Sequence, residues 1–264
     1  TALKVLEGSQ LERLVVGSLA AMLPWFKGLA LRVVGGKALS AIPEQDDVTP
    51  WDRALADHAP KVVAIDPEED LALLQYTGGT TGTPKGAMLT HQNLSANARQ
   101  INAIDPQAGT RDVIMGALPL FHVFANGCVL NRTVVNGGCI AMVPRFDAKQ
   151  VLATIRRTRP TSFPGVPTMF QALLDHPDCA RTDFSSLRAC IAGGAPLALP
   201  LKQRFEATTG TRLVEGYGLT ESSGVVSANP YESPGKPGTI GQPLPGTRIR
   251  LLDKEDASQD APAG

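Results

Sequence analysis

Cysteine and net charge are both scarce in this sequence. Its 264 residues include only four cysteines, and no two of them form a CxxC pair. A disulfide framework or a zinc site is therefore not expected, and the thiols should be reduced. Twenty-five basic residues balance twenty-five acidic ones, so nucleic acid, which usually needs a basic face, is not an expected partner. An anionic ligand would have to be held by local geometry.

No segment has the length and composition of a membrane span, and no charged-then-apolar signal segment opens the chain. The nearest approach is residues 17–30, which are too few to cross a bilayer and include Pro24 and Lys27. One interpretation is a buried helix or a surface hairpin of helices. The other is a patch peripheral to the inner face of a membrane, with Trp25 and Phe26 in the lipid.

From residue 71 onward, short apolar runs alternate with segments of helical spacing. Strands are predicted at residues 71–76, 113–118, 139–143, 161–163, 188–192 and 212–215. Thr90 and Asp147 are predicted helix caps, and Pro167 suits the first position of a helix. The alternation predicts an α/β fold with a mostly parallel sheet and helices on both faces. Ligands bind such sheets beyond the carboxyl ends of the strands, where the glycine-rich clusters of this chain are expected to converge.

The pattern divides the chain into three parts. Residues 1–70 are less regular and are expected to be part of a first α/β subdomain with connecting loops. Residues 71–230 form the main α/β subdomain, which is expected to bind the ligands. Residues 231–264 begin a small β-rich segment, with a strand expected at 248–252 and a polar tail after it. The chain starts at Thr1 rather than Met, and we expect a fragment of a longer protein.

The strongest functional signal is YTGGTTGTPKG at residues 76–86, directly after a predicted strand. Glycines let the backbone turn sharply and approach a ligand, and successive N–H groups in such a turn form an anion-binding concavity. The candidate anion-binding residues are Thr77, Gly78, Gly79, Thr80, Thr81, Gly82, Thr83 and Lys85. The motif is not the Walker A sequence, because Pro84 precedes the lysine and Gly86 follows it. The chemistry therefore need not be γ-phosphoryl transfer.

Three further clusters also follow predicted strands. AGGAP, at 192–196, allows a flat ligand to lie against bare backbone, although a plain strand-to-helix turn would explain it equally well. In EGYGLTE, at 215–221, Tyr217 can present its ring to a base, and Glu221 is an oxygen ligand suited to Mg²⁺. His122 lies in the apolar run PLFHVF. Chemistry alone leaves a core role and a functional role for this histidine equally open.

Together, TGGTTGTPKG, AMLTH and EGYGLTE closely resemble the signature sequences of the adenylate-forming superfamily. This superfamily includes acyl- and aryl-CoA synthetases, luciferases and the adenylation domains of peptide synthetases. The sequence PLFHVFANG is most similar to that of bacterial medium- and long-chain fatty acyl-CoA ligases. The resemblance runs through most of residues 61–252, whereas residues 1–60 match only in general character.

The resemblance implies ATP-dependent activation of a carboxylic acid to acyl-AMP, followed by transfer to CoA. It implies catalytic roles for Lys85, His122, Thr220 and Glu221, and a Mg²⁺ site at Thr77 and Glu221. It extends the ATP contacts beyond the phosphate loop to Gly193, Gly194, Ala195, Pro196, Glu215, Gly216, Tyr217, Gly218, Leu219 and Thr220. The ribose-binding aspartate and the lysine of the mobile C-terminal domain cannot be placed here, so the chain alone is expected to be inactive or weakly active.

The resemblance implies a cytoplasmic parent protein that acts on small-molecule substrates, and a homodimer is a further expectation. It also leaves several alternatives open. An aryl-CoA ligase or a peptide-synthetase adenylation domain is the alternative within the superfamily. A nucleotide-binding module without catalysis is the alternative outside enzymes.

Overall fold

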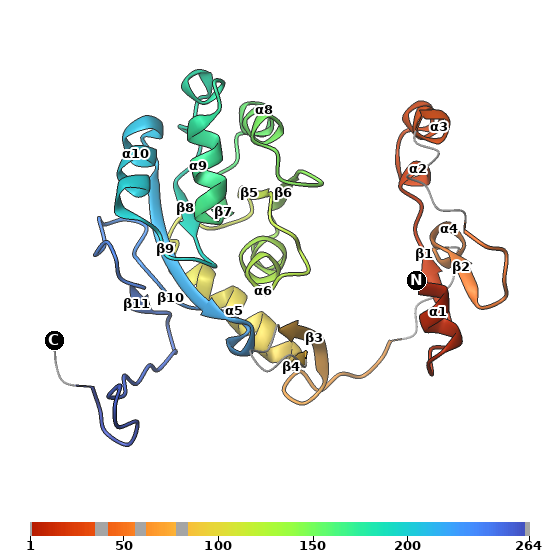
Figure 1. Ribbon diagram of the computed structural model, residues 1–264, viewed down its shortest axis with the longest axis horizontal. Helices are drawn as coiled ribbons and strands as arrows, with labels where there is room; N and C mark the ends of the chain where they lie inside the picture. The colour runs from red at the N-terminus through yellow and green to blue at the C-terminus, as the bar shows by residue number, and fades with distance from the viewer. Residues whose placement is uncertain (1, 35–41, 56–61, 78–83, 262–264) are drawn as a thin grey trace. The chain divides into compact units, whose positions relative to one another are not determined.

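The computed structural model describes residues 2–34, 42–55, 62–77 and 84–261 (Figure 1). The chain divides into two compact units, Thr1–Ala64 and Ile65–Gly264.

The first unit is built from short elements around one parallel strand pair. They are α1 (Ala2–Glu7), β1 (Leu14–Val16), α2 (Leu19–Met22), α3 (Trp25–Val34), β2 (Val48–Pro50) and α4 (Trp51–Ala54). Residues 17–30 hold α2 and the first part of α3, which agrees with the predicted surface hairpin of helices and not with the alternative of a buried helix. The helices approach closely because Gly28 has no side chain, and a Cβ there would lie 2.2 Å from the carbonyl oxygen of Ala20.

The second unit contains a seven-stranded sheet in the order β11-β10-β9-β8-β7-β5-β6. Its strands are β5 (Val113–Gly116), β6 (Cys139–Met142), β7 (Ser162–Gly165), β8 (Ala189–Ala192), β9 (Arg212–Leu219), β10 (Gly224–Ala228) and β11 (Gln242–Pro243). The five strands from β6 to β9 are parallel, while β10 and β11 join antiparallel at the other edge. The predicted mostly parallel sheet is therefore confirmed.

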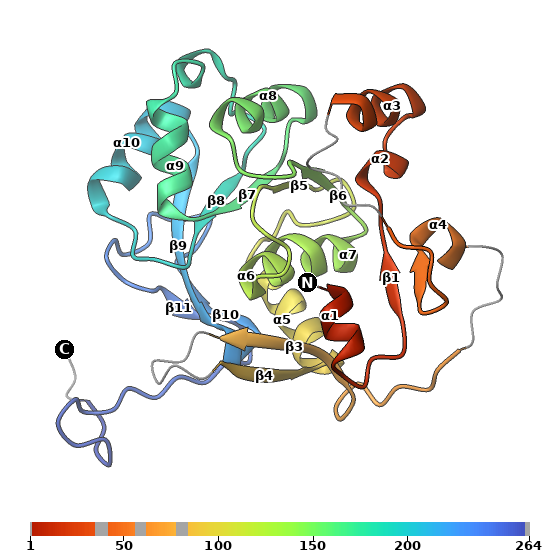
Figure 2. The same cartoon turned by 45° about the vertical axis from the view of Figure 1, so that its right-hand side comes forward.

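Helices cover both faces of this sheet (Figures 1 and 2). One face carries α8 (Ala148–Thr158), α9 (Pro167–Asp175) and α10 (Leu199–Thr209), and the other carries α5 (His91–Ala103), α6 (Val123–Ala125), η1 (Asn126–Asn131) and α7 (Arg132–Asn136). Successive strand residues supply both cores, because side chains alternate between the faces of a sheet. Cys190 and Leu213 pack in the first core, and Ile191 and Val214 pack in the second. Continuous apolar runs are the signature of such a doubly covered sheet.

Local sequence signals set the helix starts as predicted. The Thr90 hydroxyl accepts the N–H of Asn93 at 3.2 Å, and the Asn93 side chain accepts the N–H of Thr90 at 3.0 Å, which completes a capping box for α5. Asp147 accepts the N–H of Gln150 at 2.9 Å at the start of α8. Pro167 occupies the first turn of α9, where its missing N–H has no helical partner to lose.

Two strand predictions need correction. The strand expected at 212–215 continues to Leu219, because β10 pairs with its second half and supplies hydrogen bonds that override the low strand preference of glycine. The strand expected at 248–252 is reduced to one antiparallel bridge between Leu252 and Asp260. In the described chain this segment has no neighbouring strand, and an unpaired strand has no ladder to stabilise it.

The run 71–76 is a strand as predicted, but it belongs to a separate two-stranded sheet. There β3 (Leu71–Thr77) pairs antiparallel with β4 (Lys85–Thr90), which the sequence did not reveal. The strand β4 begins with a lysine and a glycine, which are both depleted in strands, so its own strand preference is weak. The hairpin places Thr77 opposite Lys85.

A buried ionic cluster lies at the amino ends of the parallel strands. Arg188 donates to Asp105 and to Asp112, both at 2.7 Å, and the fully buried Arg132 also donates to Asp105. The Thr161 hydroxyl donates to Asp112 at 2.9 Å. Burial alone would raise the pKa of Asp112, but hydrogen bonds, led by that from Arg188, outweigh it and lower the pKa below its usual value. The carboxylate is therefore held ionised.

We expect Asp112→Ala to lower the free energy of unfolding by about 3–5 kcal/mol, because it leaves buried charges and donors unpaired. Since the pKa of Asp112 is lowered in the folded state, this contribution is present above the unfolded pKa of about 3.9 and is lost as pH falls through the folded pKa. Urea denaturation at several pH values measures both effects. The control is Asp183→Ala, which breaks the solvent-exposed pair with Arg159; equal losses in the two variants would contradict the prediction.

Candidate functional site

A cavity of about 260 Å³ opens beyond the carboxyl ends of β8 and β9. It brings together three clusters that are far apart in the sequence. Its lining residues are His122, Val123, Phe124, Gly193, Gly194, Gly216, Tyr217, Gly218, Leu219, Thr220, Glu221, Gly224 and Val225. Parts of the clusters that follow β5 and β8 and of the cluster at the carboxyl end of β9 therefore meet at one edge of the sheet, whereas the expected convergence of the phosphate loop stays a prediction.

The parallel strands explain why these clusters meet. The chain leaves β5 at Gly116 and reaches His122 six residues later, and it leaves β8 at Ala192 directly into Gly193. Because β5, β7, β8 and β9 run in the same direction, their carboxyl ends lie at one edge, where open α/β sheets bind ligands. The antiparallel strand β10 then returns beside β9 and closes one side.

His122 is an exposed residue at the start of α6 and not a core histidine. Its ring Nδ1 accepts the backbone N–H of Phe124 at 3.2 Å. In a neutral imidazole one nitrogen accepts and the other donates, so this contact places the proton on Nε2. The ring can therefore donate a hydrogen bond from Nε2 to an anionic oxygen in the cavity.

The glycines of the cavity wall are required by packing within the protein. A Cβ on Gly193 would lie 3.0 Å from the Phe124 ring, and one on Gly216 would lie 2.7 Å from the Ile191 side chain. A Cβ on Gly218 would lie 2.0 Å from the carbonyl oxygen of Gly224. These close approaches leave bare backbone beside the ring of Tyr217, which is 41% exposed. A flat ligand can therefore reach the ring face of this tyrosine without meeting neighbouring side chains.

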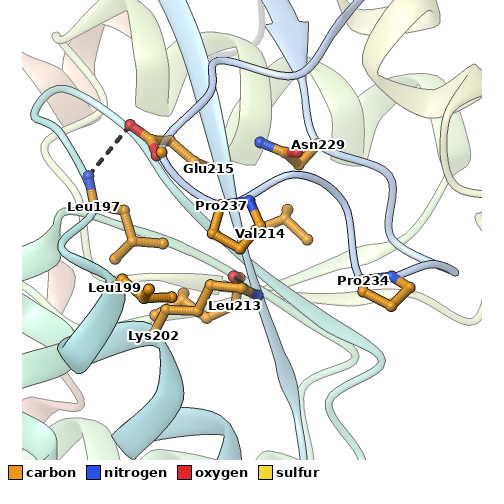
Figure 3. A pocket seen from close by; sticks show the side chains of 10 residues that line it. Leu197, Leu199, Lys202, Leu213, Val214, Glu215, Asn229, Pro234 and Pro237 are labelled. Carbon is orange, nitrogen blue, oxygen red and sulfur yellow. Dashed lines mark hydrogen bonds between the residues drawn. The ribbon is translucent and has the colours of Figure 1, made fainter.

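Glu215 lies outside this cavity. Its carboxylate accepts the N–H of Leu197 at 3.2 Å and lines a pocket of about 10 Å³ beside Lys202 and Pro237 (Figure 3). It shares this face of β9 with Leu213 because side chains two residues apart on a strand point the same way. The side chain fixes the turn after β8. Ala195 and Pro196 are likewise absent from the lining of the cavity.

The phosphate-loop residues Gly78, Gly79, Thr80, Thr81, Gly82 and Thr83 lie outside the described residues. Thr77 and Lys85, at the two ends of the loop, are opposite each other in the β3–β4 hairpin, and the Thr77 hydroxyl donates to the Lys85 carbonyl at 3.4 Å. They do not line the cavity. The strand β4 nevertheless lies beside η3 (Thr220–Ser222), which carries Thr220 and Glu221 (Figure 2).

Glu221 is the acidic side chain of the cavity and is exposed to it. The short helix η3 that carries it is followed by Ser223, whose φ of 67° is left-handed. In the described part of the chain, no three His, Cys, Asp or Glu side chains gather as a metal cluster. Mg²⁺ commonly binds through one or two carboxylates and the phosphates of a substrate. The donor set around Glu221 therefore suits Mg²⁺ that arrives with a nucleotide.

Sequence reasoning missed Gly224 and Val225, which line the cavity from β10. The signal was available, because residues 224–228 read GVVSA, a short β-branched run after a serine pair.

The chain is similar to known proteins in both sequence and fold. A family model described as AMP-binding enzyme matches residues 23–264. The long-chain-fatty-acid–CoA ligase of Bacillus subtilis strain 168 is 45% identical over 200 residues, which are 75% of this chain and 36% of that ligase. Two solved structures each cover 99% of the chain. The anthranilate CoA ligase AuaEII in complex with anthranoyl-AMP has a TM-score of 0.78 at 26% identity and is covered to 49%. ATP-bound MatB from Rhodopseudomonas palustris has a TM-score of 0.75 at 28% identity and is covered to 50%.

The chain thus spans about a third to a half of the length of these relatives.

We expect Gly218→Ala to separate β9 from β10, because its methyl group would meet the Gly224 carbonyl oxygen. Overpacking of this kind lowers the free energy of unfolding by about 1–3 kcal/mol. Thermal unfolding measures the loss. Gly109→Ala is the matched control, since a Cβ there meets nothing within 4 Å. Equal melting temperatures for the two variants would show that the close approach is not a real constraint.

Proposed function

The chain belongs to the AMP-binding enzyme family, and from this we propose that it is the ATP- and acid-binding part of an acid–CoA ligase. The proposed substrate is a fatty acid, which is activated to acyl-AMP and then transferred to CoA. The observation that carries the proposal is the cavity at the carboxyl edge of the sheet, where His122, Tyr217 and Glu221 meet. The likeness to the Bacillus subtilis fatty-acid ligase supports the choice of acid.

In the first half-reaction, a carboxylate oxygen of the acid attacks the α-phosphorus of ATP. A new phosphorus–oxygen bond forms, the bond from the α-phosphorus to the β-bridging oxygen breaks, and pyrophosphate leaves with the electron pair. No proton has to be removed, because a carboxylic acid is already ionised at neutral pH. His122, which donates from Nε2, therefore serves to orient the carboxylate and need not act as a base.

Charge on the phosphate oxygens is the main barrier to this attack. Lys85 and the Thr220 hydroxyl, together with the backbone N–H groups of the phosphate loop, would donate to these oxygens. Glu221 and the Thr77 hydroxyl are the groups that would hold Mg²⁺, which neutralises phosphate charge when it is bound. Tyr217, with glycines on both sides, is the surface on which adenine would stack.

In the second half-reaction, the thiol sulfur of CoA attacks the acyl carbonyl carbon and loses its proton. The carbon–oxygen bond to AMP breaks, and AMP leaves with the electron pair. Relatives of the adenylate-forming superfamily rotate a mobile C-terminal domain for this step, a closure of the hinge type. This step is proposed for the full-length protein.

An aryl-CoA ligase is the second candidate. It is favoured by the likeness to the anthranilate ligase AuaEII, whose TM-score is 0.78. A peptide-synthetase adenylation domain would differ in the acid that it activates, and a nucleotide-binding module without catalysis would bind ATP but form no acyl-AMP. Pyrophosphate exchange with a panel of acids from acetate to oleate and with aryl acids separates these candidates.

We expect Lys85→Ala and Glu221→Ala each to slow acid-dependent pyrophosphate exchange in the full-length protein by more than about tenfold, equivalent to roughly 1.4 kcal/mol of barrier. Lys85→Ala removes a cation from the polyphosphate, and Glu221→Ala removes the carboxylate that would hold Mg²⁺. The exchange rate with saturating acid is the measurement.

Lys149→Ala, an exposed lysine on α8, controls for the loss of a positive charge and should exchange at the wild-type rate. Wild-type rates in the Lys85 and Glu221 variants would show that these residues are wrongly assigned.

We further propose that α2 and α3 rest on the inner face of a membrane while the protein remains cytoplasmic. Trp25 is 80% exposed and Phe26 is 54% exposed, and Val33 lies two turns further along α3 with a similarly exposed side chain. Lys27 and Arg32 on the same helix would lie near anionic headgroups. None of the described helices is both long and apolar enough to span a bilayer, so the contact would be interfacial.

The double variant Trp25→Ser and Phe26→Ser should reduce co-sedimentation with vesicles that contain anionic phospholipid. It removes the two aromatic side chains of α3 that would insert into the bilayer. Trp51→Ser is the control, since Trp51 is a partly exposed ring on α4 of the same unit. Co-sedimentation that is unchanged in the double variant would remove the membrane proposal.

A further inference from the structure

Asn97 is a buried polar residue in the middle of α5, and its side chain is only 3% exposed. Its Nδ2 donates to the carbonyl oxygen of Val225 at 2.7 Å, and its Oδ1 accepts the N–H of Val225 at 3.2 Å. The two residues are 128 positions apart in the sequence. A single amide side chain thus satisfies both backbone groups of one strand residue.

The outer edge of β10 explains this arrangement. Within the described chain, β11 pairs with β10 only at Ser227 and Ala228, and the register of β10 against β9 shifts between Val225 and Ser227. Val225 therefore lies where no strand covers the outer edge, and its buried backbone groups need other partners. Asn97 supplies them. Gly224, with φ of 128°, leaves room for this contact, because a Cβ there would lie 2.7 Å from the Asn97 Oδ1.

The contact joins two parts of the candidate site. Gly224 and Val225 line the cavity together with Tyr217 and Glu221. The helix α5 begins directly after β4, whose first residue is Lys85 at the end of the phosphate loop. Asn97 therefore ties the helix that extends from the phosphate-loop hairpin to the strand that walls the cavity.

We propose that Asn97 is a positioning residue for ATP. It holds the wall of Gly224 and Val225 in register with the β3–β4 hairpin, so that the adenosine and polyphosphate parts of one ATP molecule are bound at the same time. It acts through the backbone of Val225 and touches no substrate. This inference rests on the proposed function.

The test is Asn97→Leu in the full-length protein, because leucine has nearly the shape of asparagine but makes no hydrogen bonds. It leaves the N–H and carbonyl of Val225 buried without partners, so the wall should move. In acid-dependent pyrophosphate exchange we expect KM for ATP to rise by about tenfold or more, with KM for the acid within about twofold of wild type. A variant that merely unfolds in part would lower kcat and leave both KM values unchanged.

Gln100→Leu is the matched control on the same helix. The Gln100 Nε2 donates to the carbonyl of Pro245 at 2.9 Å and to the Thr247 hydroxyl at 3.3 Å, and its Oε1 accepts a longer bond from the Asn97 Nδ2 at 3.4 Å. Neither Pro245 nor Thr247 lines the cavity, and Asn97 keeps both of its bonds to Val225 in this variant, so KM for ATP should stay at the wild-type value. If Asn97→Leu does not fold, Asn97→Asp keeps an acceptor for the Val225 N–H but places a carboxylate oxygen against the Val225 carbonyl in place of the donor, and KM for ATP should rise in the same direction.

A wild-type KM for ATP in a folded Asn97 variant, or an equal rise in Gln100→Leu, would overturn the inference and leave the proposed function intact. If the unmodified full-length protein shows no acid-dependent exchange with any acid, the proposed function fails and the inference fails with it.

Discussion

The site depends on the approach of two backbones, where β9 and β10 come so close that a side chain at Gly218 would have no room. Gly218 faces the carbonyl oxygen of Gly224, and even a methyl group would lie 2.0 Å from it. The turn between the strands is correspondingly tight, with η3 only three residues long and left-handed backbone at Ser223. This turn carries Thr220 and Glu221 at the mouth of the cavity. The geometry of the proposed phosphate and metal contacts is thus a consequence of strand packing.

Charged side chains at the amino ends of the parallel strands stabilise the fold, whereas those at the carboxyl ends are available for a ligand. At the amino ends of the strands, Asp112 is buried and its carboxylate is satisfied by Arg188 and Thr161. At the carboxyl ends, His122 and Glu221 face an open cavity and keep hydrogen-bonding capacity for a ligand. Charges that are fully paired inside the protein are poor ligands, whereas those at the cavity can exchange water for substrate. The parallel direction of the strands makes this division possible.

Local signals were readable from the sequence, and long-range pairings were not. Thr90 and Pro167 act within one helical turn, so the starts of α5 and α9 could be predicted. His122, Tyr217 and Glu221 could be assigned to one edge because strand ends in a parallel sheet coincide. The strand β10 and its contact with Asn97 depend on a partner 128 residues away, and no local pattern specifies such a partner. The strand expected at 248–252 failed for the same reason, since an alternating pattern does not supply a neighbouring strand.

Two glutamates in the motif EGYGLTE have different roles because the backbone directs their side chains to different places. Glu215 lies within β9, and its position in the strand's alternation turns it toward the α10 face, where it accepts the N–H of Leu197. Glu221 lies beyond the end of the strand, in η3, and this turn returns it to the cavity. A one-residue shift in a strand moves every side chain to the opposite face. The register that the β9–β10 contact fixes is therefore what assigns one glutamate to structure and leaves the other free for a ligand.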